Sequence, residues 1–532
     1  MRKLIASEMT APINVLDCTL RDGGYCNEWK FGASNIKKIT AGLAEAGIDI
    51  IECGFLSGKV SQREGTTRFH NTEQIKDILP ENRNGKMYVC MVNYGELSIE
   101  KLPECDGKSI DGIRIAFHKK DAKNALELCR QIKEKGYKVF VQAMVSLSYT
   151  EEQFIELIEQ CNEIEPYAFY IVDSFGAMKR KDLMRLYYIV EHRLKESILI
   201  GYHGHNNMQL AYANAQTFLD IRERRTVILD SSIYGMGRGA GNLNTELLIE
   251  YLNDNYGKSY VLKPLLVIID DILNTFYEDK HWGYSLQNYL SAKHNSHPNY
   301  AAYLDDKKTL TIENMDDIFS IIDDEKRNTF DREYIENLYL RYLSREENKE
   351  WRIEKLKKQV INRDVLIIAP GKSIQTEADK IQVFREKHEV LTFSVNFDYQ
   401  DFKSDYIFIS NARRFHVLEL QDYSNVIVTS NIPCVGVFLQ VEYGTLLNPV
   451  DNIRDNAGMM LIKLLIQLGA RKLYLAGFDG YSKDAEENYY KDNLALVVHK
   501  TIIEEKNTAL HEALELFQKQ ADLEFLTARK YI

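Results

Sequence analysis

The alternation of predicted strands and helices that decides the fold begins with the stretch Ile13-Asn14-Val15-Leu16-Asp17-Cys18-Thr19-Leu20-Arg21-Asp22-Gly23-Gly24. A short apolar run, Ile13–Asp17, gives way to polar residues and then to the helical pattern of Ser34–Ala46. The same order recurs after the apolar runs Asp49–Cys53, Met87–Val92, Gly112–Phe117, Lys138–Met144, Phe169–Asp173, Ile198–Tyr202 and Thr226–Leu229. Eight such units in roughly 200–250 residues predict a TIM barrel, although a doubly wound open sheet would alternate in the same way.

The 532 residues exceed one barrel, and we expect three parts. Residues 1–265 form the barrel, 266–358 a helical extension and linker that ends in the charged run Glu346–Lys358, and 359–532 a separate Rossmann-like α/β domain. The strands expected in that last part are Val365–Ala369, Val390–Val395, Tyr406–Ser410, Asn425–Thr429 and Lys472–Ala476, with a helix at Ala457–Leu468.

Composition excludes several classes of protein. Apolar residues make up 45% and charged residues 27%, which is typical of a globular protein. The net charge of −11 argues against nucleic acid as a partner, and no apolar run is long enough to span a bilayer. The eight cysteines include no CxxC pair, which fits reduced thiols. Met1–Pro12 has no long apolar core of the kind found in a signal peptide, so we expect a cytoplasmic protein.

The end of the first strand carries the first candidate site. Arg21 and Asp22 follow it directly, and in a barrel this is the face on which active sites are built. An Asp there can bind a hard divalent cation, and an Arg can stabilise negative charge that develops on oxygen. The competing interpretation is a turn with a surface ion pair.

The seventh strand leads into His203-Gly204-His205-Asn206-Asn207. Side chains alternate along a strand, so His203 and His205 point to the same side and form a natural pair of metal ligands. A single histidine would more often be a core residue.

A glycine-rich stretch follows the eighth strand: Gly235-Met236-Gly237-Arg238-Gly239-Ala240-Gly241-Asn242. It fits the dinucleotide fingerprint weakly, because it closes an α/β run instead of opening one. The alternative use of these glycines is a close backbone approach to a ligand at the barrel mouth, with Asn242 reaching inward. Lesser candidates at strand ends are Glu52, His118, Gln142 and Ser174.

Three stretches together resemble the motifs of the DRE-TIM metallolyase superfamily. They are Thr19-Leu20-Arg21-Asp22-Gly23, His203-Gly204-His205-Asn206 and the glycine stretch ending in Asn242. That superfamily includes 4-hydroxy-2-oxovalerate aldolases, hydroxymethylglutaryl-CoA lyases and the isopropylmalate and homocitrate synthases. The resemblance covers residues 10 to 300. It implies that Asp22, His203 and His205 bind a divalent metal, with Mn²⁺ preferred over Mg²⁺, Co²⁺ or Zn²⁺, and that Arg21 is catalytic.

The residues after Asp22 depart from both main branches of the superfamily. The acyl-CoA condensing synthases carry Gly-Glu-Gln there, and the hydroxyoxovalerate aldolases place an acid–base His where this chain has Tyr25. Tyr25 is therefore the candidate for proton transfer, and Ser174 resembles the aldolase residue that holds the keto acid. We expect Glu52, His118, Gln142 and Asn242 to bind substrate.

The resemblance implies a pyruvate-type aldolase or lyase that acts on a 2-keto acid and an aldehyde. We also expect the protein to be a homo-oligomer. Two alternatives stay open: a Claisen-type synthase that condenses an acyl-CoA with a 2-keto acid, and a nucleotide-sugar-binding protein with a decayed barrel.

The C-terminal part loosely resembles the Rossmann-type domain of certain bacterial sialyltransferases. Its strand Val365–Ala369 runs into Pro370-Gly371-Lys372-Ser373, a turn that could present backbone N–H groups to phosphate. The resemblance implies a nucleotide or nucleotide-sugar site near Gly371, Ser373 and Asn396, and a role in making unusual sugars for a surface polysaccharide. A scaffold that only mediates association is the alternative.

Overall fold

The computed structural model describes residues 12–531, except 61–63, 223–224, 308–309, 344–349, 362, 400–402, 419, 421, 435, 485–486 and 492–501. The segment before Pro12 and the first residues of the charged run Glu346–Lys358 therefore lie outside the described residues. The chain divides into two compact units: Met1–Ala302 with Asp323–Phe330, and Tyr303–Ile322 with Asp331–Ile532. The predicted boundaries at residues 265 and 358 stay predictions.

The first unit is an eight-stranded parallel barrel, as the sequence predicts. Its strands are β1 (Ile13–Asp17), β2 (Ile50–Leu56), β4 (Met87–Asn93), β5 (Gly112–Phe117), β6 (Lys138–Ala143), β7 (Ala168–Asp173), β8 (Leu199–Gly204) and β9 (Val227–Ser231). They pair in chain order, and pairing of β1 with both β2 and β9 closes the barrel. A two-residue strand, β3 (Arg68–Phe69), adds to β2.

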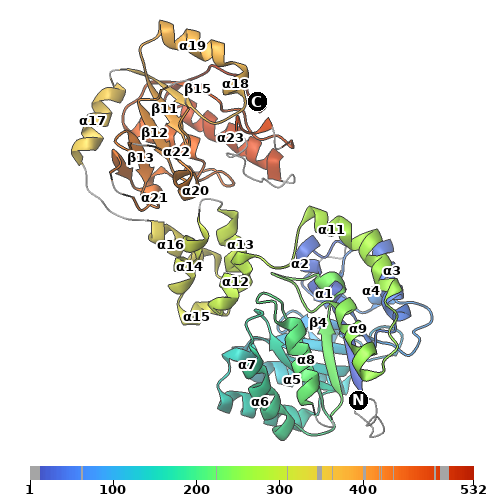
Figure 1. Cartoon of the computed structure of the whole chain (residues 1–532). Helices are drawn as coiled ribbons and strands as arrows, with labels where there is room; N and C mark the ends of the chain where they lie inside the picture. The colour runs from blue at the N-terminus through green and yellow to red at the C-terminus, as the bar shows by residue number, and fades with distance from the viewer. Residues whose placement is uncertain are drawn as a thin grey trace. The chain divides into compact units, whose positions relative to one another are not determined.

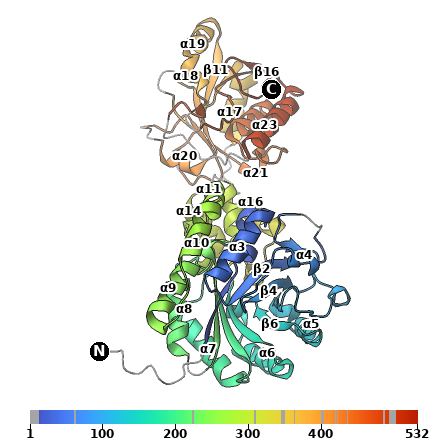
Figure 2. The ribbon, with the colours of Figure 1, turned by 90° about the vertical axis from the view of Figure 1, so that its right-hand side faces the viewer.

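Helices surround the barrel strands (Figures 1 and 2). They are α3 (Ala33–Glu45), α4 (Glu73–Lys76), α5 (Ala122–Glu134), α6 (Glu151–Ile164), α7 (Arg180–Arg193), α8 (Ala211–Ile221) and α9 (Thr245–Tyr256). α6 shows why such stretches are helical: Thr150 and Gln153 form a capping box, and Phe154, Leu157, Ile158 and Cys161 make one buried stripe. Apolar side chains fill the space between helices and strands, and a smaller cluster that includes Leu16, Val89 and Phe140 fills the barrel interior.

The chain between the two sheets is helical in its described residues, as predicted. Its helices are α10 (Lys263–Ile268), α11 (Asn274–Asp279), α12 (Leu286–Lys293), α13 (Pro298–Asp306), α14 (Ile312–Ser320), α15 (Asp324–Arg327), α16 (Arg332–Leu343) and α17 (Glu350–Ile361). In α17, Leu356 and Val360 are buried while Glu354, Lys355 and Lys358 are exposed, so this end of the charged run is the solvated face of a packed helix.

The second unit contains a seven-stranded parallel sheet in the order β14-β13-β12-β11-β10-β15-β16. Its strands are β10 (Asp364–Ile368), β11 (Val390–Val395), β12 (Tyr406–Ile409), β13 (Val426–Thr429), β14 (Leu439–Val441), β15 (Lys472–Ala476) and β16 (Asp522–Phe525). Helices α19 (Ala378–Lys387), α22 (Ala457–Gln467) and α23 (Ile503–Gln518) pack around it (Figure 1). The five predicted strands and the helix over 457–467 are confirmed, and the short strands β14 and β16 were not predicted.

No helix in the described part of the chain is both long and apolar enough to cross a membrane.

Candidate metal centre

The turn after β1 places Arg21 and Asp22 in α1 (Thr19–Asp22), where both side chains are buried. Asp17 fixes this turn, since its carboxylate accepts hydrogen bonds from the Thr19 amide at 2.9 Å and the Thr245 hydroxyl at 2.7 Å. Burial raises the pKa of Asp17 to about 6. The sequence therefore uses one carboxylate to shape the turn and a second, Asp22, to face the site.

His203 in β8 and His205 directly after it lie side by side, with ring centroids 5.2 Å apart. His205 Nε2 is 3.8 Å from Asp22 Oδ2. One ligand atom each from Asp22, His203 and His205 lies within 4.8 Å of the others, and all three residues are buried. The predicted convergence of one carboxylate and two imidazoles is present.

Hydrogen bonds fix which imidazole nitrogen of each histidine is available. His205 Nδ1 lies 3.1 Å from the Gly241 carbonyl oxygen, which can only accept, so Nδ1 carries the proton. His203 Nδ1 lies 3.0 Å from Asp230 Oδ2 and donates to that carboxylate. Both Nε2 atoms therefore keep their lone pairs, as metal-binding histidines do. Burial lowers the pKa of His205 to about 3, which keeps it neutral.

Asp22 is held as a carboxylate. Burial alone would raise its pKa, but Arg21 Nη1, 2.6 Å from Oδ1, and the two nearby histidines outweigh it and hold the pKa well below the usual range. The Asn242 amide nitrogen donates to Asp22 Oδ2 at 2.6 Å and to the Met236 carbonyl at 3.3 Å. The amide oxygen of Asn242 therefore remains available to bind a cation.

The described residues fit a divalent cation. They offer a carboxylate oxygen, two imidazole nitrogens and the Asn242 amide oxygen, which is buried and has no partner among the described residues. This mixture of oxygen and imidazole ligands suits several divalent metals and does not select one.

Gly237 leaves room for two side chains of the site, whereas the predicted approach of the glycine backbone to a ligand stays a prediction. A side chain there would place its Cβ 2.1 Å from the Asn242 amide nitrogen and 2.7 Å from Asp22 Oδ2. Only glycine leaves room for these two groups to meet.

A buried charge network connects the metal group to the barrel interior. Arg21 Nε donates to Glu52 Oε2 at 2.9 Å, and Arg114 Nη1 donates to the same oxygen at 2.8 Å. Arg114 also pairs with Asp230, the carboxylate that holds His203. The sequence interpretation missed Arg114 and Asp230. The available signals were an arginine inside the apolar strand β5 and an aspartate directly after the predicted eighth strand.

Two buried guanidinium nitrogens near Asp22, Arg21 Nη2 and Arg238 Nε, have no partner among the described residues. Gln142 Nε2, in β6, is a third buried donor without such a partner. Arg238 Nη2 donates to the Ser174 carbonyl at 3.1 Å, and its guanidinium carbon lies 5.4 Å from the Tyr25 ring centroid. Arg238 lies within the glycine stretch, and the sequence pattern alone assigns it no role.

The remaining predicted residues occupy different positions. Tyr25 is half-buried and packs edge-on against Trp29, while the Ser174 hydroxyl accepts the Val145 amide at 2.9 Å. His118 follows β5, and burial followed by Lys120 lowers its pKa. Thus Arg21, Asp22, Glu52, His203, His205 and Asn242 are joined by direct contacts, whereas Tyr25, His118, Gln142 and Ser174 make no such contact with the metal group.

In the second unit, Gly371 and Ser373 lie at the turn after β10, beside the loop after β15. Both the amide and the hydroxyl of Ser373 donate to Asp479, the former at 2.7 Å. The Asn396 side chain accepts the Ser410 amide at 3.2 Å. A phosphate at this turn would have to replace the Asp479 carboxylate, and the nucleotide site stays a prediction.

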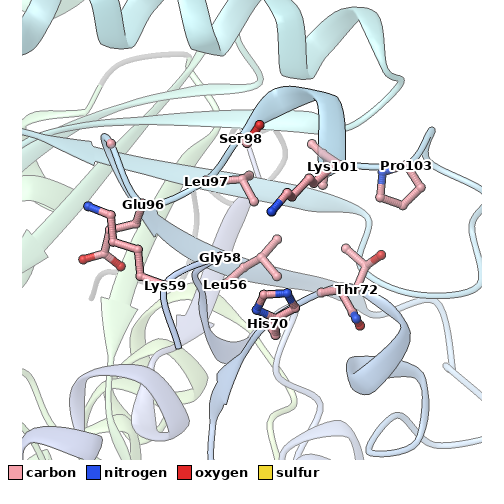
Figure 3. A pocket seen from close by; sticks show the side chains of 13 residues that line it. Leu56, Gly58, Lys59, His70, Thr72, Glu96, Leu97, Ser98, Lys101 and Pro103 are labelled. Carbon is pink, nitrogen blue, oxygen red and sulfur yellow. The ribbon is translucent and has the colours of Figure 1, made fainter. Parts of the chain in front are cut away.

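A cavity of about 490 Å³ lies beside the ends of β2 and β4 (Figure 3). Its lining includes Leu56, Lys59, His70, Leu97 and Lys101, and none of its lining residues belongs to the metal group.

The first unit is thus a parallel barrel with a buried Asp–His–His group at the carboxyl ends of its strands. In a comparison with known protein families, residues 12–261 of this unit match the HMGL-like family. A 4-hydroxy-2-oxovalerate aldolase from Carboxydothermus hydrogenoformans is 30% identical over 250 residues, which cover 46% of this chain and 71% of that protein. The chain therefore belongs, through its first half, to the HMGL-like family.

Other similar proteins cover the same region. An oxaloacetate decarboxylase from Mycobacterium tuberculosis is 26% identical over 239 residues, or 45% of this chain and 69% of that protein. The crystal structure of the N-terminal domain of a candidate aldolase from Bacteroides vulgatus matches with a TM-score of 0.50 and 29% identity. That match covers 56% of this chain and 98% of that domain.

Proposed function

We propose that the protein is a divalent-metal-dependent lyase that makes or breaks a carbon–carbon bond next to a 2-keto acid. The observation that carries this proposal is the buried Asp22–His203–His205 group with unused guanidinium nitrogens beside it. Unpaired buried donors are costly, and a substrate rich in oxygen atoms would satisfy them.

When bound to Asp22, His203 and His205, the cation acts as a Lewis acid that favours charge on the keto oxygen of the substrate. We propose Mn²⁺ as that cation, with Mg²⁺, Co²⁺ and Zn²⁺ as the alternatives.

Arg21 is proposed to stabilise the enolate oxygen. Its Nη1 and Nε are committed to Asp22 and Glu52, which fixes the guanidinium and leaves Nη2 for the substrate. A donor already held in place costs no reorganisation during the reaction. Glu52 acts through Arg21 as a positioning residue.

Arg238 is proposed to hold the substrate carboxylate through its unpaired Nε, with Gln142 as a second donor. Tyr25, which lies under the Arg238 guanidinium, is proposed to carry the proton of the substrate hydroxyl. Ser174, His118 and Asn242 are proposed to line the substrate site.

The similar proteins support this class of reaction. Cleavage of a hydroxy keto acid and decarboxylation of a keto diacid both leave an enolate next to a carboxylate. The oxaloacetate decarboxylase among the relatives makes decarboxylation the second candidate function. A Claisen-type condensation is disfavoured by Gly24 and Tyr25, which replace the residues of the synthases.

For the second unit we propose a nucleotide or nucleotide-sugar site, which would connect the lyase to unusual-sugar or surface-polysaccharide synthesis. We further propose that the chain acts in the cytoplasm as a homo-oligomer. Thermal stabilisation of the full chain by nucleotides tests the nucleotide site, and its sedimentation tests the homo-oligomer.

The test of the lyase function is a pyruvate-release screen with Mn²⁺ over 4-hydroxy-2-oxovalerate, oxaloacetate and keto-sugar acids. We expect pyruvate from at least one compound, and no turnover after Asp22→Asn or His203→Ala. The surface substitution His192→Ala is the control. Unchanged turnover in both site variants, or no response to chelation, would overturn the proposal.

A further inference from the structure

The turn between α12 and α13 brings a third histidine, His297, to the barrel mouth. Asn207, just after β8, donates to the Asn288 carbonyl at 3.4 Å and thereby ties α12 to the segment that carries His203 and His205, the proposed metal ligands. Ala292 of α12 packs with Val145 and Phe175, from the loops after β6 and β7. The turn that follows α12 therefore lies over the carboxyl ends of three barrel strands.

The His297 ring is held on several sides. It packs edge-on against Phe175, with centroids 5.8 Å apart, and lies 6.2 Å from the Phe330 centroid. Its backbone amide donates to the Arg327 carbonyl at 2.8 Å, and Arg327 also donates to the His294 carbonyl. The ring is half-buried and lies next to Phe175, the residue that follows Ser174 in the proposed substrate site.

The hydrogen bonding of His297 fixes its tautomer. Its Nδ1 accepts the Asn299 amide at 3.1 Å, at the start of α13, so the neutral ring carries its proton on Nε2. No described residue bonds to Nε2. A neutral imidazole held at a helix N-terminus in this way can polarise a carbonyl by donating from Nε2, as the catalytic histidine of triosephosphate isomerase does.

The charged groups around His297 favour the neutral form. Burial, followed by Arg238, His118 and His205, lowers the pKa of His297 to about 3. Arg327 of α15 and His294 of the same turn add no negative charge. The ring thus stays a neutral donor across the physiological pH range, and its packing against Phe175 places it next to Ser174 of the proposed substrate site.

We propose that the Nε2–H group of His297 donates a hydrogen bond to the aldehyde-derived oxygen of the substrate during carbon–carbon bond cleavage and formation. This inference rests on the proposed lyase function. In cleavage, the hydroxyl proton leaves to a base, the bond between C3 and C4 breaks, and its electron pair stays on C3 as the enolate. His297 stabilises the oxygen on C4 as it passes from alkoxide to carbonyl, without giving up its own proton.

Two substitutions separate the roles of the two ring nitrogens. His297→Asn keeps a short polar side chain that caps α13 well and removes the donor at Nε2. His297→Gln places an amide nitrogen near the position of Nε2. His294→Gln, on the same turn, is the matched control.

Two reactions are measured for each protein with Mn²⁺. One is cleavage of 4-hydroxy-2-oxovalerate, or of the screened compound that is cleaved fastest. The other is exchange of pyruvate methyl protons in D₂O, which needs the enolate site and no aldehyde. Affinity for Mn²⁺ is a third readout that does not depend on turnover.

We expect His297→Asn to lower the kcat of cleavage about a hundredfold, the typical effect of removing one donor to a developing oxyanion. Pyruvate exchange and Mn²⁺ affinity should stay near those of the unsubstituted protein. His297→Gln should recover about tenfold of the loss, with an unchanged shape of the pH–rate profile.

The assignment would be overturned if His297→Asn cleaved the substrate with an unchanged kcat, or if it lost pyruvate exchange as strongly as cleavage. It would also be overturned if the kcat of His297→Gln were no higher than that of His297→Asn. Loss of the acidic limb of the pH–rate profile in His297→Gln would make His297 a base and would also overturn it. If the unsubstituted protein neither exchanges pyruvate nor cleaves any compound, the lyase function fails, and the role of His297 fails with it.

Discussion

Arg114 and Asp230 form an ion pair in the barrel interior, and the same Asp230 oxygen accepts the Nδ1 proton of His203. Burial alone would raise the pKa of Asp230, but Arg114 and His203 outweigh it and lower the pKa, so the carboxylate stays charged. The orientation of one proposed metal ligand therefore depends on an arginine that lies on β5.

Arg114→Met should destabilise the barrel by about 3–5 kcal/mol, because Glu52 and Asp230 would remain buried without their shared counter-charge. Urea unfolding followed by tryptophan fluorescence measures the change. Arg185→Met, which removes an exposed partner of Glu151, should cost less than about 1 kcal/mol. Equal effects of the two substitutions would contradict the role given to the buried pair.

Asp230→Asn should weaken binding of Mn²⁺ about tenfold to a hundredfold, since loss of the carboxylate makes His203 a weaker and less well oriented ligand. Competition with a fluorescent chelator measures the affinity. Glu191→Gln removes the carboxylate that pairs with Arg225 at 3.2 Å and serves as the control. Affinity unchanged in the Asp230 variant would show that His203 needs no such support.

Gly237→Ala should impair metal binding without unfolding the protein, because the added Cβ would push Asn242 and Asp22 apart. Circular dichroism and Mn²⁺ titration together distinguish the two effects. Gly444→Ala, where the nearest atom is a flexible Glu442 oxygen at 3.6 Å, should change neither. A Gly237 variant with full affinity would argue that Asn242 and Asp22 need not approach this closely.

Stability in acid should depend on His297. Its pKa is lower in the folded chain than in the unfolded one, so the unfolded chain binds the extra proton as pH falls from about 6.5 toward about 3, and stability is lost in that window. His297→Asn should remove about 1 kcal/mol of that loss per pH unit. Burial raises the pKa values of Asp17 and Asp173 to about 6 and about 7, so protonation of these two groups favours the folded state as pH falls. This opposite contribution to stability is the same in both proteins.

The difference in unfolding free energy between the two metal-free proteins at pH 7 and pH 5 therefore isolates His297. Parallel pH dependence in the two proteins would mean that the ring titrates as it does in water.

The sequence sufficed for the barrel and the metal group because both depend on regular features. Ile13–Asp17 is apolar, buried and followed by a turn, and the other barrel strands repeat this pattern. Parallel strands in a barrel end on one face, so Asp22, His203 and His205 are expected to converge there although they are far apart in the chain.

The parts that the sequence did not reveal depend on contacts that no local pattern encodes. β16 (Asp522–Phe525) alternates polar and apolar residues over only four positions and forms beside β15. His297 lies on a turn after the barrel, and only the packing of α12 brings it to the mouth. Asp479 reaches Ser373 from a distant loop, so the turn at Gly371 looks more open to phosphate in the sequence than it is in the fold.

The most direct test of the account is calorimetric titration of the full metal-stripped chain with Mn²⁺, beside its Asp22→Asn and His203→Ala variants. We expect one cation per chain in the unsubstituted protein and a loss of binding in both variants, with unchanged circular dichroism. Equal binding by all three proteins would show that Asp22, His203 and His205 do not hold the cation.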